Sequence, residues 1–175
     1  MTHVTPANRR LLKKRTPVDI EVETDEMKST TIPNQAMITS QMNGATAVFI
    51  WCGTSKLVVG HIGPLIINKI PFNGQLRDSS MKKVRLSSEF RKQLVGLPAA
   101  TKVMIRASDE DQADEIKEVL GFARVGITPE VEVYGYTNDW SRRNDEFRFE
   151  ATLGNVGHIM ENLTPHPASP SSEWK

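Results

Sequence analysis

Cys52 and His61 are the residues whose types most directly suggest catalysis, because Cys52 is the only cysteine and a histidine follows it closely. A thiolate attacks carbonyl carbon atoms, and an imidazole can take the thiol proton and return a proton to the leaving group. The two side chains must lie within hydrogen-bond reach to act in this way. Whether they can meet depends on the elements that carry them.

Segment 39–64 has the pattern of a β-hairpin, with an apolar first strand, a turn at 53–56 and a second strand that contains His61. In this pairing Cys52 lies at the turn end of the ladder, whereas His61 lies opposite a residue near Val48. The two side chains would then be about four residues apart along the ladder, or roughly 13 Å. We therefore predict that Cys52 is a buried or edge thiol and not a nucleophile.

The other polar residues of the hairpin have structural interpretations as well. A single histidine in an apolar strand is usually a core or edge residue, and threonine is common before strands. Asn43 could bond the amide of a substrate, but Asn-Gly is also an ordinary turn pair. Residue types alone leave both interpretations open for Thr39, Asn43 and His61.

Two short stretches resemble the active-site hairpin of the glutamine deamidases, the family of the chemoreceptor deamidases and the cytotoxic necrotizing factor toxins. They are Thr-Ser-Gln-Met-Asn-Gly-Ala at 39–45 and His-Ile-Gly-Pro at 61–64. In that family a Gly-Cys turn opens the strand, a histidine follows about 15 to 17 residues later, and several members have a threonine about six residues before the cysteine. Here the separations are 16 and 6 residues, and the cysteine position is Ala45. The order of elements over 86–160 carries the resemblance more weakly.

The resemblance implies a role for each position. Ala45 would mark the attacking position, His61 would be the general base and acid, and Thr39 would orient His61. Backbone N–H groups of the turn would stabilise the oxyanion. The oxyanion and substrate-binding residues would be Asn43, Gly44 and Thr46.

Because alanine supplies no nucleophile, the resemblance implies a thiol amide hydrolase or acyl-transfer scaffold that is inactive as written. Either the cysteine of an enzyme has been replaced, or the protein is a natural pseudoenzyme. The partner would be an amide, from a protein Gln or Asn side chain or from a small molecule. Thr46 is a poor substitute because an unactivated hydroxyl is a weak nucleophile. The alternatives are a non-catalytic binding module that uses the same cleft, and an accidental match on a core hairpin.

Composition limits the other classes of function. With 175 residues, 38% of them hydrophobic, the chain suits one domain with a real core. The balance of 22 basic and 21 acidic residues gives no bias toward nucleic acid or membrane, and we expect neither as a partner. One cysteine and no apolar leader predict a cytoplasmic protein. The histidines lack ligand partners at metal spacing, so we expect no metal and no cofactor.

The sequence predicts a flexible basic tail at 1–16, one α+β domain at 17–163 and a disordered tail at 164–175. For the domain, the resemblance implies a mixed sheet layered with helices, in an α/β/β sandwich. Around the hairpin we expect an edge strand at 18–23 followed by a polar loop to about 34, a turn at 73–75, and a helix that starts at Ser87 or Ser88 and ends by Gly96. Further strands are expected at 102–106, 131–136, 147–151 and 156–160. We also expect a helix that is capped by Ser108 and that buries Ala113, Ile116, Val119 and Leu120. Between the later strands, a loop contains Trp140, Arg142 and Arg143, which either clamp a ligand or pack on the sheet.

Overall fold

The computed structural model describes residues 17–42, 44–65, 73–134 and 147–162 of the chain, with side chains from residue 80 onward in its first helix. The predicted tails, Asn43 and the segment with Trp140 lie outside these residues. Neither of the helices in the described part of the chain is long and apolar enough to span a membrane.

The larger of the two sheets has five strands in the order β2-β5-β4-β6-β7. Its neighbours are antiparallel except for β6 and β7, which run parallel. The central pair β4 and β5 is the predicted hairpin. The strands are β2 (Glu26–Thr30), β4 (Thr46–Cys52), β5 (Lys56–Ile62), β6 (Lys102–Ala107) and β7 (Glu130–Val133).

The smaller sheet has four strands in the order β1-β3-β8-β9. Its first pair is parallel, and the other pairs are antiparallel. The strands are β1 (Ile20–Glu21), β3 (Met37–Thr39), β8 (Arg148–Ala151) and β9 (Met160–Asn162). The chain therefore passes from the smaller sheet at β1 into the larger sheet at β2, and back again at β3.

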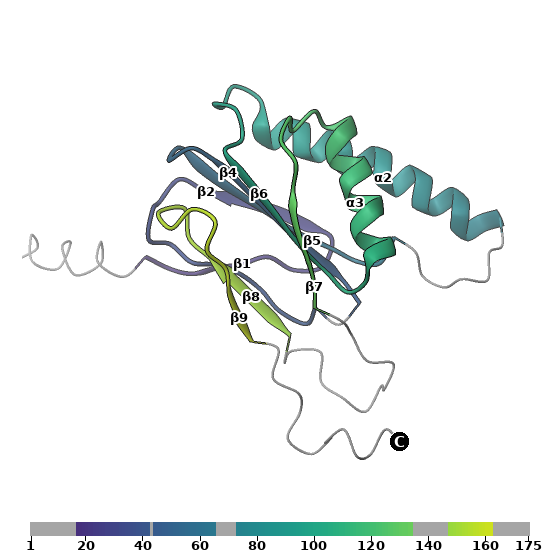
Figure 1. Cartoon of the computed structure of the whole chain (residues 1–175), viewed down its shortest axis with the longest axis horizontal. Coiled ribbons are helices and arrows are strands. Elements are labelled where there is room, and N and C mark those ends of the chain that lie inside the picture. Colours follow the sequence, from purple (N-terminus) through teal and green to yellow (C-terminus); the bar gives the residue numbers. More distant parts are fainter. Residues whose placement is uncertain (1–16, 43, 66–72, 135–146, 163–175) are drawn as a thin grey trace, which may run out of the picture.

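Two helices, α2 (Asn73–Leu94) and α3 (Glu110–Phe122), lie side by side on one face of the larger sheet, and the smaller sheet lies on its other face (Figure 1). Two separate apolar cores fill the spaces between these layers. The protein is therefore an α+β fold with three layers of helices, sheet and sheet, which confirms the predicted fold class.

Strand β4 shows why its sequence is apolar throughout. Val48, Ile50 and Cys52 belong to the core beneath the helices, whereas Phe49 and Trp51 belong to the core between the sheets. Alternate side chains of a strand point to opposite faces, and here both faces are covered. Every residue of β4 is buried as a result.

Two predicted elements near α2 and β2 were wrong. The helix begins at Asn73, so segment 73–75 is helical and Ser87 lies in the helix interior. The Ser87 hydroxyl donates to the backbone carbonyls of Lys83 and Val119 and does not cap a helix. The predicted loop before Asn34 contains β2, an edge strand that pairs with β5. Its charged residues gave it the composition of a loop, although such residues are common in edge strands.

The second half of the chain follows the predictions more closely. The strand at 102–106 and the buried stripe of α3 are confirmed. The cap of α3 is Asp109 and not Ser108, because the Asp109 carboxylate accepts a hydrogen bond from the Gln112 amide. The last strand was predicted at 156–160 but spans Met160–Asn162, since a turn that bonds His158 to Asn155 precedes it.

Candidate functional site

His61 lies near the end of β5, directly between Glu26 of β2 and Ala47 of β4. Cross-strand partners share a face of the sheet, so the imidazole is on the side that faces the smaller sheet. It is 1% exposed. Its Nδ1 lies 3.2 Å from the carbonyl oxygen of Val22, which can only accept a hydrogen bond. Nδ1 is therefore the donor of this pair.

Burial lowers the pKa of His61, although the contact with Val22 and the charges of Asp25 and Glu26 oppose this effect. The imidazole is thus neutral near pH 7. With the proton on Nδ1, the second nitrogen Nε2 presents a lone pair and can only accept a hydrogen bond. Nε2 is buried, and it is the one buried side-chain nitrogen or oxygen without a hydrogen-bond partner in the described part of the chain.

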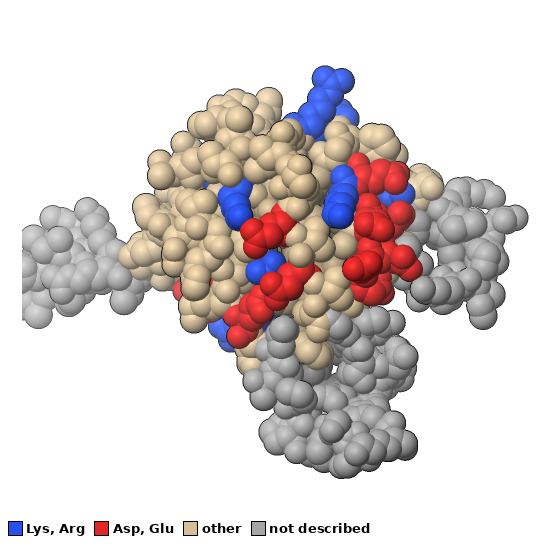
Figure 2. Space-filling view, viewed as in Figure 1, with Lys and Arg blue, Asp and Glu red and all other residues tan. Residues whose placement is uncertain are grey.

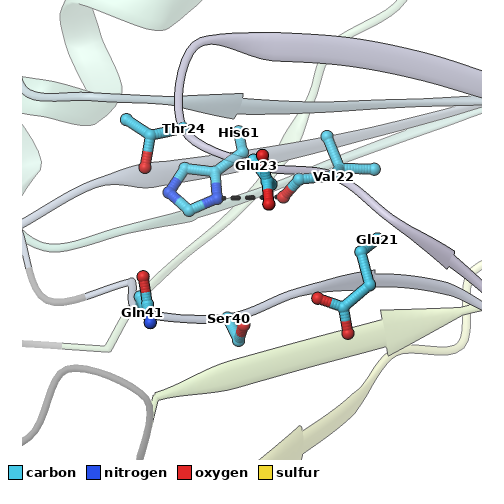
Figure 3. A pocket seen from close by; sticks show the side chains of 7 residues that line it. All are labelled: Glu21, Val22, Glu23, Thr24, Ser40, Gln41 and His61. Atoms are coloured by element: carbon cyan, nitrogen blue, oxygen red, sulfur yellow. Dashed lines mark hydrogen bonds between the residues drawn. The ribbon is translucent and has the colours of Figure 1, made fainter.

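A cleft of about 340 Å³ opens beside this imidazole. Figure 3 shows the imidazole of His61 between two segments, with its second nitrogen pointing away from Val22 and toward the side where Thr24 and Gln41 lie. The volume is enough for one long side chain or a small molecule. The cleft is lined by Glu21, Val22, Glu23, Thr24, Ser40, Gln41 and His61.

Backbone strain is stored at Gln41, which lines the cleft, and at Asp25, which follows the lining residue Thr24. Gln41 and Asp25 have backbone φ angles of 57° and 62°, values that residues other than glycine rarely adopt. Asp25 is held in place because its carboxylate accepts the Gly63 amide at 3.0 Å and pairs with Lys82 at 2.9 Å. Burial raises the pKa of Asp25, but the bonds from Lys82 and Gly63 outweigh this and the pKa falls below its ordinary value. The carboxylate therefore stays charged while it supports this bend.

Ala45, the predicted attacking position, is buried in the core between the sheets and is absent from the lining of the cleft. Its amide donates to the carbonyl oxygen of Met42 at 2.7 Å and closes a tight turn in which Gly44 has a φ of 94°. The Tyr134 hydroxyl lies within hydrogen-bond distance of the carbonyls of Met42 and Ala45. The Ala45 amide is thus committed to the turn and is not available to an oxyanion.

The side chain of Thr39 bonds Met42 and not His61. Its hydroxyl is buried and donates to the Met42 sulfur at 3.1 Å, while the imidazole of His61 is held by Val22. Thr46 is buried opposite Ile62, at the start of β4. The roles that the resemblance implies for Thr39, Asn43, Gly44 and Thr46 remain predictions.

The hairpin register separates Cys52 from His61, as predicted. His61 pairs with Ala47, the neighbour of Val48, and Cys52 pairs with Lys56. Ala47 and Cys52 are an odd number of residues apart, so their side chains point to opposite faces. Burial raises the pKa of the Cys52 thiol, which lies in the core beneath the helices. Cys52 is a structural thiol.

Arg106 is a buried charged residue that the sequence reasoning did not single out. It lies on the other side of Ala47 from His61 and on the same face of the sheet. Its Nε bonds the Glu161 carboxylate of the smaller sheet at 2.5 Å, and its terminal nitrogen lies 3.7 Å from Glu132. The sequence signal that could have identified this residue is an arginine inside the largely apolar strand 102–107. The pair with Glu161 links the two sheets.

The two carboxylates that line the cleft were also missed as site residues. Glu21 and Glu23 follow from the alternation of strand 18–23, in which they face away from the buried Val22. No cluster of three or more histidine, cysteine or acidic side chains suited to a metal ion occurs within the described ranges.

Comparison of the sequence with protein-family models and with curated proteins finds no match. The geometry itself defines an α/β/β sandwich with a buried neutral histidine at a small polar cleft. The resemblance to the glutamine deamidases therefore stays a prediction made from the residues of this chain.

Proposed function

We propose that the protein is a non-catalytic binding module that uses the cleft beside His61, on a scaffold resembling the thiol amidases. One observation carries the proposal: the buried Nε2 of His61 has no hydrogen-bond partner, and His61 is one of the residues that line the cleft. An unpaired buried acceptor costs about 1–3 kcal/mol. A ligand that donates a hydrogen bond to Nε2 recovers this free energy on binding.

The fixed tautomer of His61 defines the polarity of that ligand. Since Nδ1 donates to Val22, the cleft offers an acceptor at Nε2. Carboxylates and carbonyl oxygens are excluded as partners of this atom, while N–H and O–H groups fit. A primary carboxamide, the substrate group that the resemblance implies, offers such an NH2 group.

Binding without turnover follows from position 45. Alanine has no nucleophilic atom, and the amide of Ala45 already donates to Met42. An amide held at His61 would therefore meet no attacking group from this residue. The protein in this form would hold its ligand and release it unchanged.

The test uses protein labelled with nitrogen-15 in its histidines and a short glutamine peptide as the probe. We expect the Nε2 resonance of His61 to move with a saturable dependence on peptide concentration. The exposed His158 is an internal control, whose resonances should stay fixed. With affinity measured by titration calorimetry, His61→Gln should bind about tenfold or more weakly, because a hydrogen bond to a buried acceptor is lost. If neither a high concentration of the peptide nor other ligands that donate hydrogen bonds change the His61 resonances, the proposal is contradicted.

A second candidate, a thiol amidase whose nucleophile is replaced, is favoured by the register of the hairpin. Ala45 lies two residues from Ala47, the direct partner of His61. Ala45→Cys should then release ammonia from glutamine peptides, and Ala45→Cys with His61→Ala should not. If the restored thiol releases none while the histidine resonances still respond to the ligand, the scaffold binds but is not a disabled amidase.

A further inference from the structure

We infer that the cleft selects a positively charged donor: a primary ammonium or a guanidinium, carried by a basic side chain or by a free polyamine. The inference rests on the proposed binding function and adds the charge of the ligand. Three features of the described residues support it, and they concern the lining charges, the donor count and the neighbouring cations.

Every charged group among the described residues that line the cleft is an acid. Glu21 and Glu23 contribute two exposed carboxylates, and no lysine or arginine is among the described lining residues. His61 adds no positive charge because it is neutral. The ligand therefore meets two carboxylates and an uncharged acceptor in the lining of one cleft, which favours a cation over a neutral amide.

The number of acceptors in the wall also suits a cation. Beyond Nε2 of His61, the lining includes the hydroxyls of Thr24 and Ser40 and the side-chain amide of Gln41. An ammonium carries three N–H donors and a guanidinium carries five, whereas a primary amide carries two. A ligand with more donors can satisfy Nε2 and the wall together.

Lysines that approach this region are committed to other acids. Lys28 pairs with Glu26 at 3.3 Å and donates to the Glu21 carbonyl, while Lys82 pairs with Asp25 at 2.9 Å. The carboxylates of these ion pairs, Glu26 and Asp25, do not line the cleft. Glu21 and Glu23 thus remain the acids that face a ligand.

A second acidic surface covers α3, where Figure 2 shows red side chains gathered on the right of the molecule. This surface has the charge for a cation, but none of its described residues carries a buried acceptor without a partner, so it offers only general attraction. It supplies a matched control. Glu110 and Asp114 are exposed acids of α3 whose neutralisation changes the net charge as much as neutralising Glu21 and Glu23.

The experiment compares butylammonium, butylguanidinium and the neutral pentanamide, with the His61 resonances as the readout. We expect the cations to bind about 3- to 10-fold more tightly than the amide, and the difference to shrink as salt is raised. Glu21→Gln with Glu23→Gln should weaken cation binding by a similar factor and leave the amide unchanged. Glu110→Gln with Asp114→Asn should change neither.

A lysine or arginine peptide and spermidine, tested in parallel, distinguish a protein side chain from a free polyamine. Tighter binding of either one supports the charge selectivity and identifies the source. Equal or better binding of the amide, with no effect of Glu21→Gln and Glu23→Gln, overturns the inference and leaves the binding function standing. If no probe moves the His61 resonances, the proposed function itself fails.

Discussion

The hydroxyl of Tyr134 donates to the carbonyl oxygen of Ala45 at 2.7 Å, although 89 residues separate them in the chain. The ring of Tyr134 packs against Phe147 and Phe149, with ring centroids 5.6 and 5.4 Å apart. The turn at Met42–Ala45 is therefore held by a residue just after β7. This contact connects the turn that precedes β4 to the far edge of the larger sheet.

Removal of that hydroxyl should loosen the turn. Burial raises the pKa of Tyr134, so the group remains a donor throughout the ordinary pH range. We expect Tyr134→Phe to lower the free energy of unfolding by about 1–2 kcal/mol, because backbone carbonyls at the turn lose their donor while the ring contacts remain. Urea denaturation followed by fluorescence measures the change. An unchanged midpoint and slope would show that the hydroxyl contributes nothing to stability.

The ion pair between Arg106 and Glu161 should stabilise the contact between the sheets. Arg106 is buried, and Glu161→Gln would leave its charge with the more distant carboxylate of Glu132. We expect a loss of about 1–3 kcal/mol in the free energy of unfolding. The control Glu150→Gln, which removes the partner of the exposed Arg148, should cost less than about 0.5 kcal/mol. Equal losses in the two variants would argue against a special role for the Arg106 pair.

His61 should make stability depend on pH in a defined window. Its pKa is lower in the folded protein than the value of about 6.5 in an unfolded chain, so the unfolded state binds more protons in between. The full contribution of His61 is present above about pH 6.5 and is lost as the pH falls through the folded pKa. His61→Gln should flatten this part of the profile. The contribution of Asp25, whose folded pKa is also depressed, is lost at lower pH, below about 3.9. If the free energy of unfolding of His61→Gln depends on pH in the same way as that of the parent below about pH 6.5, the lowered pKa of His61 is contradicted.

Cys52 should be unreactive in the folded protein. The thiol is fully buried, and burial raises its pKa, so little thiolate forms near neutral pH. We expect a disulfide reagent to modify the native protein at least about 100-fold more slowly than the protein in denaturant, since modification requires opening of the core. Rapid native modification, comparable with that of a free thiol, would show that Cys52 is accessible.

How far the sequence predicts this fold is clear from the hairpin and from α2. Residues 46–52 and 56–62 alternate between two buried faces around a short turn, so local pattern specifies both the strands and the distance from Cys52 to His61. Segment 73–75 was predicted as a turn because Asn73 and Gly74 favour turns locally, whereas it is the start of a helix of 22 residues. Tertiary packing overrides local propensity in such a segment.

By itself, the sequence determined the α+β class, the central hairpin and the position of His61 in it, because these depend on neighbours in the chain. Only the tertiary structure decided that Val22, 39 residues earlier, holds Nδ1 and leaves Nε2 without a partner at an acidic cleft. It also decided that Ala45 lies in the core, with its amide committed to a turn. Hydrogen-bond partners and burial arise from segments that meet only when the two sheets pack, and no local pattern encodes them.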